Sequence, residues 1–190
     1  MIIAAIDEVG RGPIAGPVVA VAVILTKKAL PNELYDAIRD SKQLNSRTRE
    51  QLAQELMRHV PYGIGAVSSR LIDRLNILQA TLLAMQRAWH RLPLKPQLTL
   101  IDGTHAPELP CATRTIIKGD EKDKGIAAAS IIAKVTRDRL MTRLSARYPA
   151  YQWQRNAGYP TVAHRAALAE GLSPHHRLSF RPCHRHVIES

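Results

Sequence analysis

Short aliphatic runs bounded by Gly or Pro recur along the chain, and such runs are typical of β-strands. The run PVVAVAVILT at 17–26 is apolar at successive positions, so both of its faces are apolar and we expect it inside a sheet. Four shorter runs share the pattern. The strands that we predict cover residues 2–6, 17–26, 62–69, 98–102 and 112–118.

Longer segments carry apolar residues at the spacing of an α-helix. The segment at 125–148 is rich in alanine and stops before Pro149, and Ser46 and Thr161 are candidate N-caps of two others. The order of these elements, with strands first and then alternating strands and helices, predicts an α/β fold around a mixed sheet. The predicted helices cover 46–60, 71–92, 125–148 and 161–172, and the basic last eighteen residues, rich in His and Pro, are expected to be irregular.

Charge is the feature of the composition that changes this picture most. The 190 residues, enough for one domain with at most a small appendage, include 27 Lys and Arg against 16 Asp and Glu, a formal net charge of +11. A domain this basic indicates a polyanionic partner, with nucleic acid as the first candidate and an anionic membrane surface as the second. The alternative is a generally basic soluble protein.

Cys111 and Cys183 are too few for a disulfide framework, and no segment resembles a signal peptide or a membrane span. We therefore expect a soluble, cytoplasmic protein.

Acidic residues stand at the ends of the predicted strands. Asp7 and Glu8 follow the run at 2–6, Asp102 ends the run LTLID, and Asp120 lies beyond the fifth strand. Because adjacent side chains of a regular strand point to opposite faces, we expect the first strand to end before Asp7 and Glu8, so that both can face one site. Ligands bind at strand ends of an α/β sheet, and clustered carboxylates there suit a divalent cation such as Mg²⁺. We interpret these acids as a metal site for phosphodiester hydrolysis; the alternative is that each is a surface or turn residue.

Glycines bracket Arg11 directly after the acids. Gly10, Gly12 and Gly16 do not form a dinucleotide-binding G-x-G-x-x-G, because the last glycine comes one position late and a strand follows instead of a helix. The chain has no phosphate-binding G-x-x-x-x-G-K-[ST] motif either. We interpret Gly10 and Gly12 as points where the backbone approaches a ligand, with Arg11 available to phosphate or sugar oxygens. A tight turn with a solvated arginine is the alternative.

Two other groups of residues suggest rival chemistry. The segment CHRH brings together Cys183, His184 and His186 like half of a zinc site, but the partner half is missing, so we interpret it as part of a solvated basic tail. No sequence feature fixes a pair of histidines for metal-free acid–base catalysis. Asp138 follows Lys134 by four residues, which predicts either a helix-face ion pair or an alternative fourth acid for the metal site.

Seven segments, in order from residue 2 to about 181, carry a specific resemblance. They read IDEVGRGPIAGPVVAVAVIL, DSKQLN, IDRLNILQATLLAM, LIDG, KGDEKDKGIAAASIIAKVTRD, AGYPTVAH and HRLSF. Together they resemble the bacterial ribonuclease HII family of type 2 ribonucleases H. The resemblance implies a ribonuclease H-like fold, a five-stranded mixed sheet flanked by helices with a small helical carboxyl-terminal part. We expect a catalytic domain at 1–150 and a substrate-binding extension with a basic tail at 151–190.

The resemblance also implies an activity and a metal site. Members of the family hydrolyse the RNA strand of RNA–DNA hybrids and incise 5′ to a ribonucleotide embedded in duplex DNA, leaving a 3′-hydroxyl and a 5′-phosphate. The resemblance is the main reason for preferring Asp120 to Asp138. The acids that would hold Mg²⁺ or Mn²⁺ in this chain are Asp7, Glu8, Asp102 and Asp120.

Substrate contacts are carried over in the same way. Gly10, Arg11 and Gly12 match the motif that senses the 2′-hydroxyl, Tyr159 matches the tyrosine that packs on the neighbouring deoxyribose, and Lys42 resembles the residue that contacts the backbone near the scissile phosphate. The chain departs from the pattern at Asp123, where many relatives carry Ser. We interpret this extra charge beside Asp120 as a change in phosphate contacts or metal affinity.

The leading hypothesis is therefore a monomeric endoribonuclease that uses two metal ions. One ion would activate a water molecule and the other would stabilise the leaving 3′-oxygen. The partners would be RNA–DNA hybrid and ribonucleotide-containing duplex DNA. Two alternatives stay open at this point: a non-catalytic duplex-binding module, whose binding would depend strongly on salt, and a metal-dependent nuclease for other DNA structures.

Overall fold

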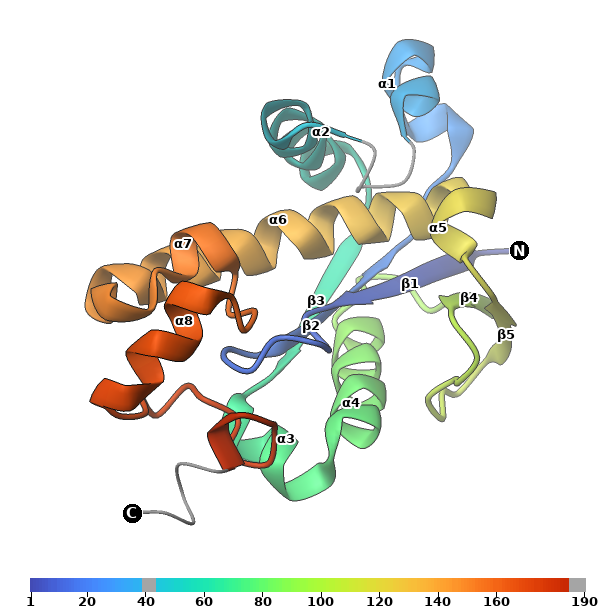
Figure 1. Ribbon diagram of the computed structural model, residues 1–190. Helices are drawn as coiled ribbons and strands as arrows, with labels where there is room; N and C mark the ends of the chain where they lie inside the picture. The colour runs from blue at the N-terminus through green and yellow to red at the C-terminus, as the bar shows by residue number, and fades with distance from the viewer. Residues whose placement is uncertain (39–43, 185–190) are drawn as a thin grey trace.

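A mixed sheet of five strands forms the centre of the molecule. The computed structural model describes residues 1–38 and 44–184 (Figure 1). The strands lie in the order β3-β2-β1-β4-β5, with β1–β2 and β2–β3 antiparallel and β1–β4 and β4–β5 parallel. This arrangement confirms the predicted fold class. The strands are β1 (Ile3–Val9), β2 (Val18–Val23), β3 (Tyr62–Val67), β4 (Leu98–Asp102) and β5 (Ala112–Ile116).

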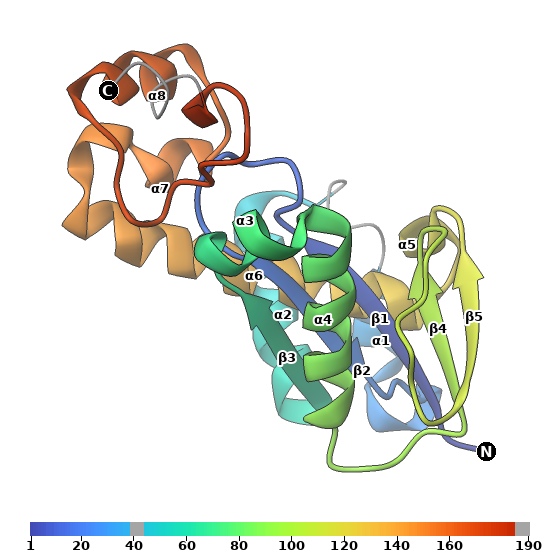
Figure 2. The same cartoon turned by 90° about the horizontal axis from the view of Figure 1, so that it is seen from below.

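Helices cover both faces of this sheet (Figures 1 and 2). The long α6 and the more distant α2 cover one face, and α4 covers the other. No helix in the described part of the chain is both long and apolar enough to cross a membrane. The helices are α1 (Asn32–Ala37), α2 (Ser46–His59), α3 (Ser69–Leu75), α4 (Ile77–His90), α5 (Gly119–Lys122), α6 (Lys124–Arg147), α7 (Trp153–Asn156) and α8 (Val162–Ala167), with short 3-10 turns at Lys27–Ala29, Pro149–Tyr151 and Leu168–Glu170.

Alternate residues of β1 enter two different cores. Ala4 and Ile6 belong to the buried cluster under α4, which includes Ala84, whereas Ala5 belongs to the cluster under α6, which includes Ile131. The strand is thus buried on both faces, as is β2, all of whose residues are buried. This confirms the prediction that the apolar run at 17–26 lies in the interior of the sheet.

Two of the predictions about the helices are wrong: one predicted helix is interrupted, and another has a different N-cap residue. The predicted helix at 71–92 is divided into α3 and α4 at Asn76, whose φ of 66° is incompatible with a continuous right-handed helix. The Asn76 side chain accepts a hydrogen bond from the backbone N–H of Gln79 (3.1 Å) and so caps α4. Asn45, and not Ser46, caps α2. The Thr161 cap of α8 is confirmed.

A third buried cluster joins the carboxyl-terminal residues to the rest of the molecule. Ile14, from the loop after β1, packs with Met141 of α6 and with Trp153, Leu168 and Cys183. The carboxyl-terminal part therefore lies against the loop that follows β1, as Figure 2 shows. The division of the chain at residue 150 stays a prediction, since α6 contributes to this cluster as well as to the main core.

Candidate active site

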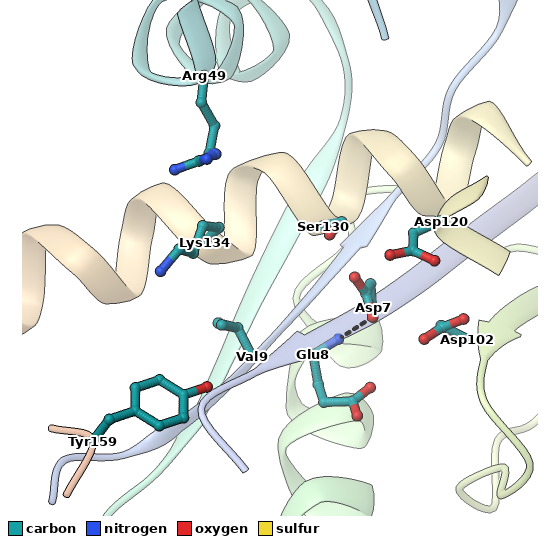
Figure 3. A pocket seen from close by; sticks show the side chains of 9 residues that line it. All are labelled: Asp7, Glu8, Val9, Arg49, Asp102, Asp120, Ser130, Lys134 and Tyr159. Carbon is teal, nitrogen blue, oxygen red and sulfur yellow. Dashed lines mark hydrogen bonds between the residues drawn. The ribbon is translucent and has the colours of Figure 1, made fainter. Parts of the chain in front are cut away.

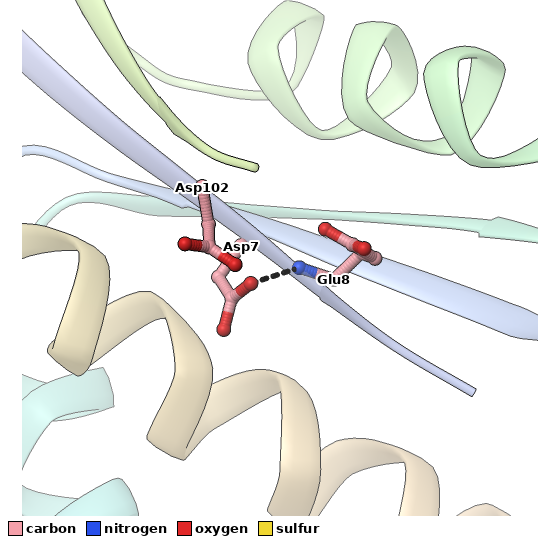
Figure 4. A group of neighbouring side chains, drawn as sticks. All are labelled: Asp7, Glu8 and Asp102. Carbon is pink, nitrogen blue, oxygen red and sulfur yellow. Dashed lines mark hydrogen bonds between the residues drawn. The ribbon is translucent and has the colours of Figure 1, made fainter. Parts of the chain in front are cut away.

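Asp7 and Glu8 lie inside β1, not beyond its end. The strand continues regularly to Val9, with Asp7 opposite Val21 and Glu8 opposite Ala20 on β2. The prediction that the strand ends before the two acids is therefore wrong. Their side chains do start from opposite faces of the sheet: Asp7 lies on the α6 side and Glu8 on the α4 side, as Figure 4 shows.

The two acids share a site because β1 has a free edge at this point. Pairing with β4 stops at Ile6 and Ile101, three residues before β1 ends, whereas pairing with β2 continues. Both carboxylates can bend around that edge toward Asp102, the last residue of β4 (Figure 4). One oxygen from each of Asp7, Glu8 and Asp102 lies within 4.8 Å of the others.

Asp120 lies beside this trio. It is buried at the start of α5 and lines the same cavity, although it is not part of the compact group. The adjacent Gly119 N–H donates to Asp102 Oδ1 (2.6 Å), which ties α5 to the end of β4. The alternative acid, Asp138, forms an ion pair with Lys134 (2.9 Å) and lines a different cavity between α2, α6 and α7.

Burial and mutual repulsion make the acids costly to ionise. Burial, followed by the charge of Glu8, raises the pKa of Asp7 well above its ordinary value, while a hydrogen bond from Ser130 partly opposes the shift. Burial also raises the pKa of Glu8. The Arg11 guanidinium partly offsets this rise, whereas the negative charge of Asp102 adds to it. A bound cation would offset the repulsion and favour the ionised forms of Asp7 and Glu8.

The donor set fits a hard divalent cation. Glu8 Oε2 is buried and has no hydrogen-bond partner among the described residues, which is unusual for a carboxylate oxygen. The convergent groups are all carboxylates, the ligands that Mg²⁺ and Mn²⁺ prefer. Within the described residues this is also the one group of three or more His, Cys, Asp or Glu side chains with the spacing of a metal site.

The acids line a cavity of about 500 Å³ whose opposite wall is basic and aromatic (Figure 3). Arg49 from α2 and Lys134 from α6 are on that wall, and Tyr159 stands at one side of the opening with about half of its surface exposed. A cavity with carboxylates on one side and cations on the other suits a phosphodiester that bridges a metal ion and the basic wall.

The glycine-bracketed loop connects the acids to Tyr159. Arg11 Nη1 lies 3.3 Å from Glu8 Oε1, and a Cβ atom added to Gly12 would lie 3.3 Å from Tyr159 Cε1. The loop therefore lies between Glu8 and Tyr159, which both line the cavity. Lys42 lies outside the described residues.

Asp123 has a structural role that the sequence did not reveal. Its side chain accepts a hydrogen bond from the backbone N–H of Ile126 (2.9 Å) and caps α6. Serine is also a strong N-cap, so the exchange of Ser for Asp preserves this interaction. Its effect on phosphate or metal binding stays a prediction.

Three polar residues of the cavity were not predicted from the sequence as site residues: Arg49, Ser130 and Lys134. A signal for two of them was present, since Ser130, Lys134 and Asp138 recur every four residues and therefore share one face of the helix. The sequence offered no comparable signal for Arg49, because it reaches the cavity from another helix.

The carboxyl-terminal histidines and cysteine do not all lie in a solvated tail. His176 and Cys183 are buried, and His184 is exposed. Burial raises the pKa of the Cys183 thiol to about 11, which keeps it protonated and unreactive. The interpretation as a solvated tail is therefore wrong for Cys183, and His186 lies outside the described residues.

We expect His176 to make stability depend on pH. Burial, followed by the neighbouring His164 and His175, lowers its pKa from 6.5 to about 4. The unfolded chain therefore binds more protons between these two values, so the free energy of unfolding should rise by up to about 3 kcal/mol from pH 4 to pH 6.5. Urea denaturation of the protein and of His176→Gln across this range measures the contribution. Parallel pH profiles for the two proteins would contradict it.

Comparisons with known proteins agree with this arrangement. A sequence model of the family described as Ribonuclease HII matches residues 4–186. The chain is 56% identical over 182 residues to Ribonuclease HII of Granulibacter bethesdensis, covering 94% of this chain and 83% of the relative.

Two solved structures extend the comparison. The crystal structure of the ribonuclease H2 from Pyrococcus horikoshii superposes with a TM-score of 0.85 at 27% identity, covering 97% of this chain and 96% of that one. Bst-RNase HIII in complex with Mn²⁺ has the same fold, with a TM-score of 0.70 at 20% identity over 90% of this chain and 70% of that one. On this family match, the chain belongs to the ribonuclease HII family.

Proposed function

We propose that this chain incises duplex DNA 5′ to an embedded ribonucleotide and hydrolyses the RNA strand of RNA–DNA hybrids, leaving a 3′-hydroxyl and a 5′-phosphate. As a member of the ribonuclease HII family it is a metal-dependent endonuclease that acts on nucleic acid. The observation that carries the proposal is the meeting of three carboxylates within 4.8 Å at one end of a cavity with a basic wall. We expect it to act as a monomer in the cytoplasm.

Asp7, Glu8 and Asp102 would hold Mg²⁺ or Mn²⁺, and Asp120 would complete the acidic wall. When bound, the metal ions lower the pKa of a water molecule and neutralise charge on the reacting phosphate. Asp102 is oriented by the Gly119 N–H, and the Ser130 hydroxyl hydrogen-bonds Asp7. These contacts fix the direction of the carboxylates before the substrate arrives.

The proposed recognition site lies next to the acids. The 2′-hydroxyl is what distinguishes a ribonucleotide from its neighbours in DNA, so its sensor must lie within a sugar's width of the reacting phosphate. The Gly10–Gly12 segment meets this condition, because Arg11 contacts Glu8 and Gly12 borders Tyr159. Arg49, Lys134 and, from the family resemblance, Lys42 are the proposed phosphate contacts.

A panel of three labelled substrates tests the proposal: duplex DNA with one ribonucleotide, an RNA–DNA hybrid, and an all-DNA duplex of the same sequence. We expect cleavage of the first two and none of the third, because the all-DNA duplex offers no 2′-hydroxyl. Cleavage of the all-DNA duplex at a comparable rate would instead favour a nuclease for other DNA structures. Salt-dependent binding without any product would indicate a non-catalytic module.

A further inference from the structure

Arg177 is fully buried, and its guanidinium is directed at backbone carbonyls of the loop after β1. Its Nη2 donates to Gly10 O (2.5 Å), Nη1 to Arg11 O (2.8 Å) and Nε to Gly16 O (3.0 Å). Within the described part of the chain it forms no ion pair with a carboxylate. The fork of a single guanidinium thus holds both ends of the loop that carries Arg11.

Backbone hydrogen bonds attach the same loop to the carboxyl-terminal part. Arg177 N donates to Ile14 O (2.8 Å), Gly16 N donates to His175 O (2.9 Å), and Ile14 N donates to Gly158 O (2.9 Å). The last of these bonds joins the loop to the residue directly before Tyr159. The loop and Tyr159 are therefore neighbours in one hydrogen-bonded unit.

His164 fixes the other side of that unit. Its Nδ1 lies 2.8 Å from Tyr159 O and must donate to that carbonyl, so its Nε2 is an acceptor. Trp153 Nε1 donates to Nε2 (3.1 Å), and His176 Nε2 lies at 3.1 Å from the same atom. His176 Nδ1 accepts from Ser173 N (2.9 Å), so its proton is on Nε2 and points at His164. Each ring carries one proton, and the single lone pair of His164 Nε2 is shared between the N–H groups of Trp153 and His176.

We propose that Arg177 and His164 are positioning residues for ribonucleotide recognition. Arg177 holds the Gly10–Gly12 loop and His164 holds the backbone of Tyr159, so that together they fix the gap between the loop and the tyrosine. The inference rests on the proposed function, because it assigns the gap to the sugar at the cleavage site. A misplacement of about 1 Å at such a site costs on the order of 10²-fold in rate. Neither residue lines the catalytic cavity, so each acts through the residues that it holds.

Arg177→Lys tests the first contact. A lysine keeps the charge, but all its N–H donors are on one nitrogen, so they cannot reproduce the planar fork whose three nitrogens reach the three carbonyls. We expect kcat/KM on the single-ribonucleotide duplex to fall at least about 10-fold, and hydrogen exchange in residues 10–17 to increase, while a Mn²⁺-induced rise in melting temperature is retained. Arg87→Lys is the matched control, because exposed Arg87 also donates to a backbone carbonyl, Ala66 O (2.7 Å), on the α4 side of the sheet. The control should change none of these quantities.

Two substitutions of His164 test the second contact. In His164→Gln, the amide oxygen can replace Nε2 as acceptor for Trp153 and His176, but the donor to Tyr159 O is lost. In His164→Asn, the amide N–H can replace Nδ1 as donor to Tyr159 O, while the acceptor is lost. We expect Gln to lower kcat/KM on the single-ribonucleotide duplex at least about 10-fold and Asn to preserve more of it. If His164 only stabilised the fold, kcat/KM would fall more in His164→Asn than in His164→Gln, or would fall equally in both, in proportion to the loss in melting temperature.

The outcomes separate the inference from the proposed function. If the wild type selects the ribonucleotide but Arg177→Lys and His164→Gln keep its kcat/KM on the single-ribonucleotide duplex, and residues 10–17 of Arg177→Lys exchange as in the wild type, the inference is overturned and the function stands. If the wild type shows no selectivity, the proposed function fails, and the role in recognition fails with it. In that case hydrogen exchange in residues 10–17 still decides whether Arg177 holds the loop.

Discussion

Asp102→Asn is expected to lower the rate of incision at a single ribonucleotide by about 10³-fold or more, because a charged metal ligand contributes several kcal/mol to the transition state. Asparagine has nearly the same shape, and its Oδ1 can still accept the hydrogen bond from Gly119 N, so the fold should be preserved. Single-turnover kinetics measures the rate, and anisotropy with a labelled duplex measures binding. We expect the affinity for the duplex to change little, since basic residues supply most of it.

The matched control for this substitution is Glu108→Gln, which removes an exposed carboxylate in the loop between β4 and β5, outside the cavity. It should leave both rate and binding unchanged. Normal turnover by Asp102→Asn would remove Asp102 from the proposed metal site. Equal losses of rate in both variants would show that the effect comes from net charge and not from the acidic trio.

Gly10→Ala is expected to destabilise the protein by roughly 3 kcal/mol, because two costs add at this position. The residue has a φ of +90°, which side chains rarely adopt, and an added Cβ would lie 2.2 Å from Arg137 Nε and 2.8 Å from Pro17 O. Arg137 is buried and donates to Pro17 O, Ala157 O and Ala15 O, so it has no room to move away. Urea denaturation of wild type and variant measures the difference.

Gly12→Ala provides the contrast. Its added Cβ would approach Tyr159 Cε1 to 3.3 Å, and the half-exposed tyrosine can shift, so we expect a stability within about 0.5 kcal/mol of the wild type. The cost should appear as slower incision of the single-ribonucleotide duplex, because Tyr159 is displaced from its proposed place at the sugar. A Gly10→Ala variant as stable as Gly12→Ala would contradict this account of the loop.

The sequence predicted most of the fold because its strands and its longest helix have strong local signals. β2 is apolar on both faces, and α6 is rich in alanine. The division between α3 and α4 was missed because it depends on the left-handed conformation of one residue, Asn76, inside a continuous apolar pattern. Residue type alone does not specify that conformation.

The sequence predicts which acids form the site but not how they meet. Regular alternation sends adjacent side chains to opposite faces, which leads to the wrong prediction that the strand ends before Asp7 and Glu8. In the structure the strand continues, and the carboxylates of Asp7 and Glu8 meet around an edge that β4 leaves free. The contacts of Arg177 and His164 could not be found from the sequence at all, because they join the carboxyl-terminal part to a loop about 160 residues earlier and to Tyr159 through side-chain geometry.

The most direct test is incision of a 5′-labelled duplex that contains one ribonucleotide, measured with Mn²⁺ or Mg²⁺, then with excess EDTA, and then after the metal is restored. The account predicts a single cut 5′ to the ribonucleotide that leaves a 3′-hydroxyl, disappears with EDTA and returns with the metal. Incision that survives EDTA would contradict the assignment of Asp7, Glu8 and Asp102 as the metal site of a ribonucleotide-specific nuclease.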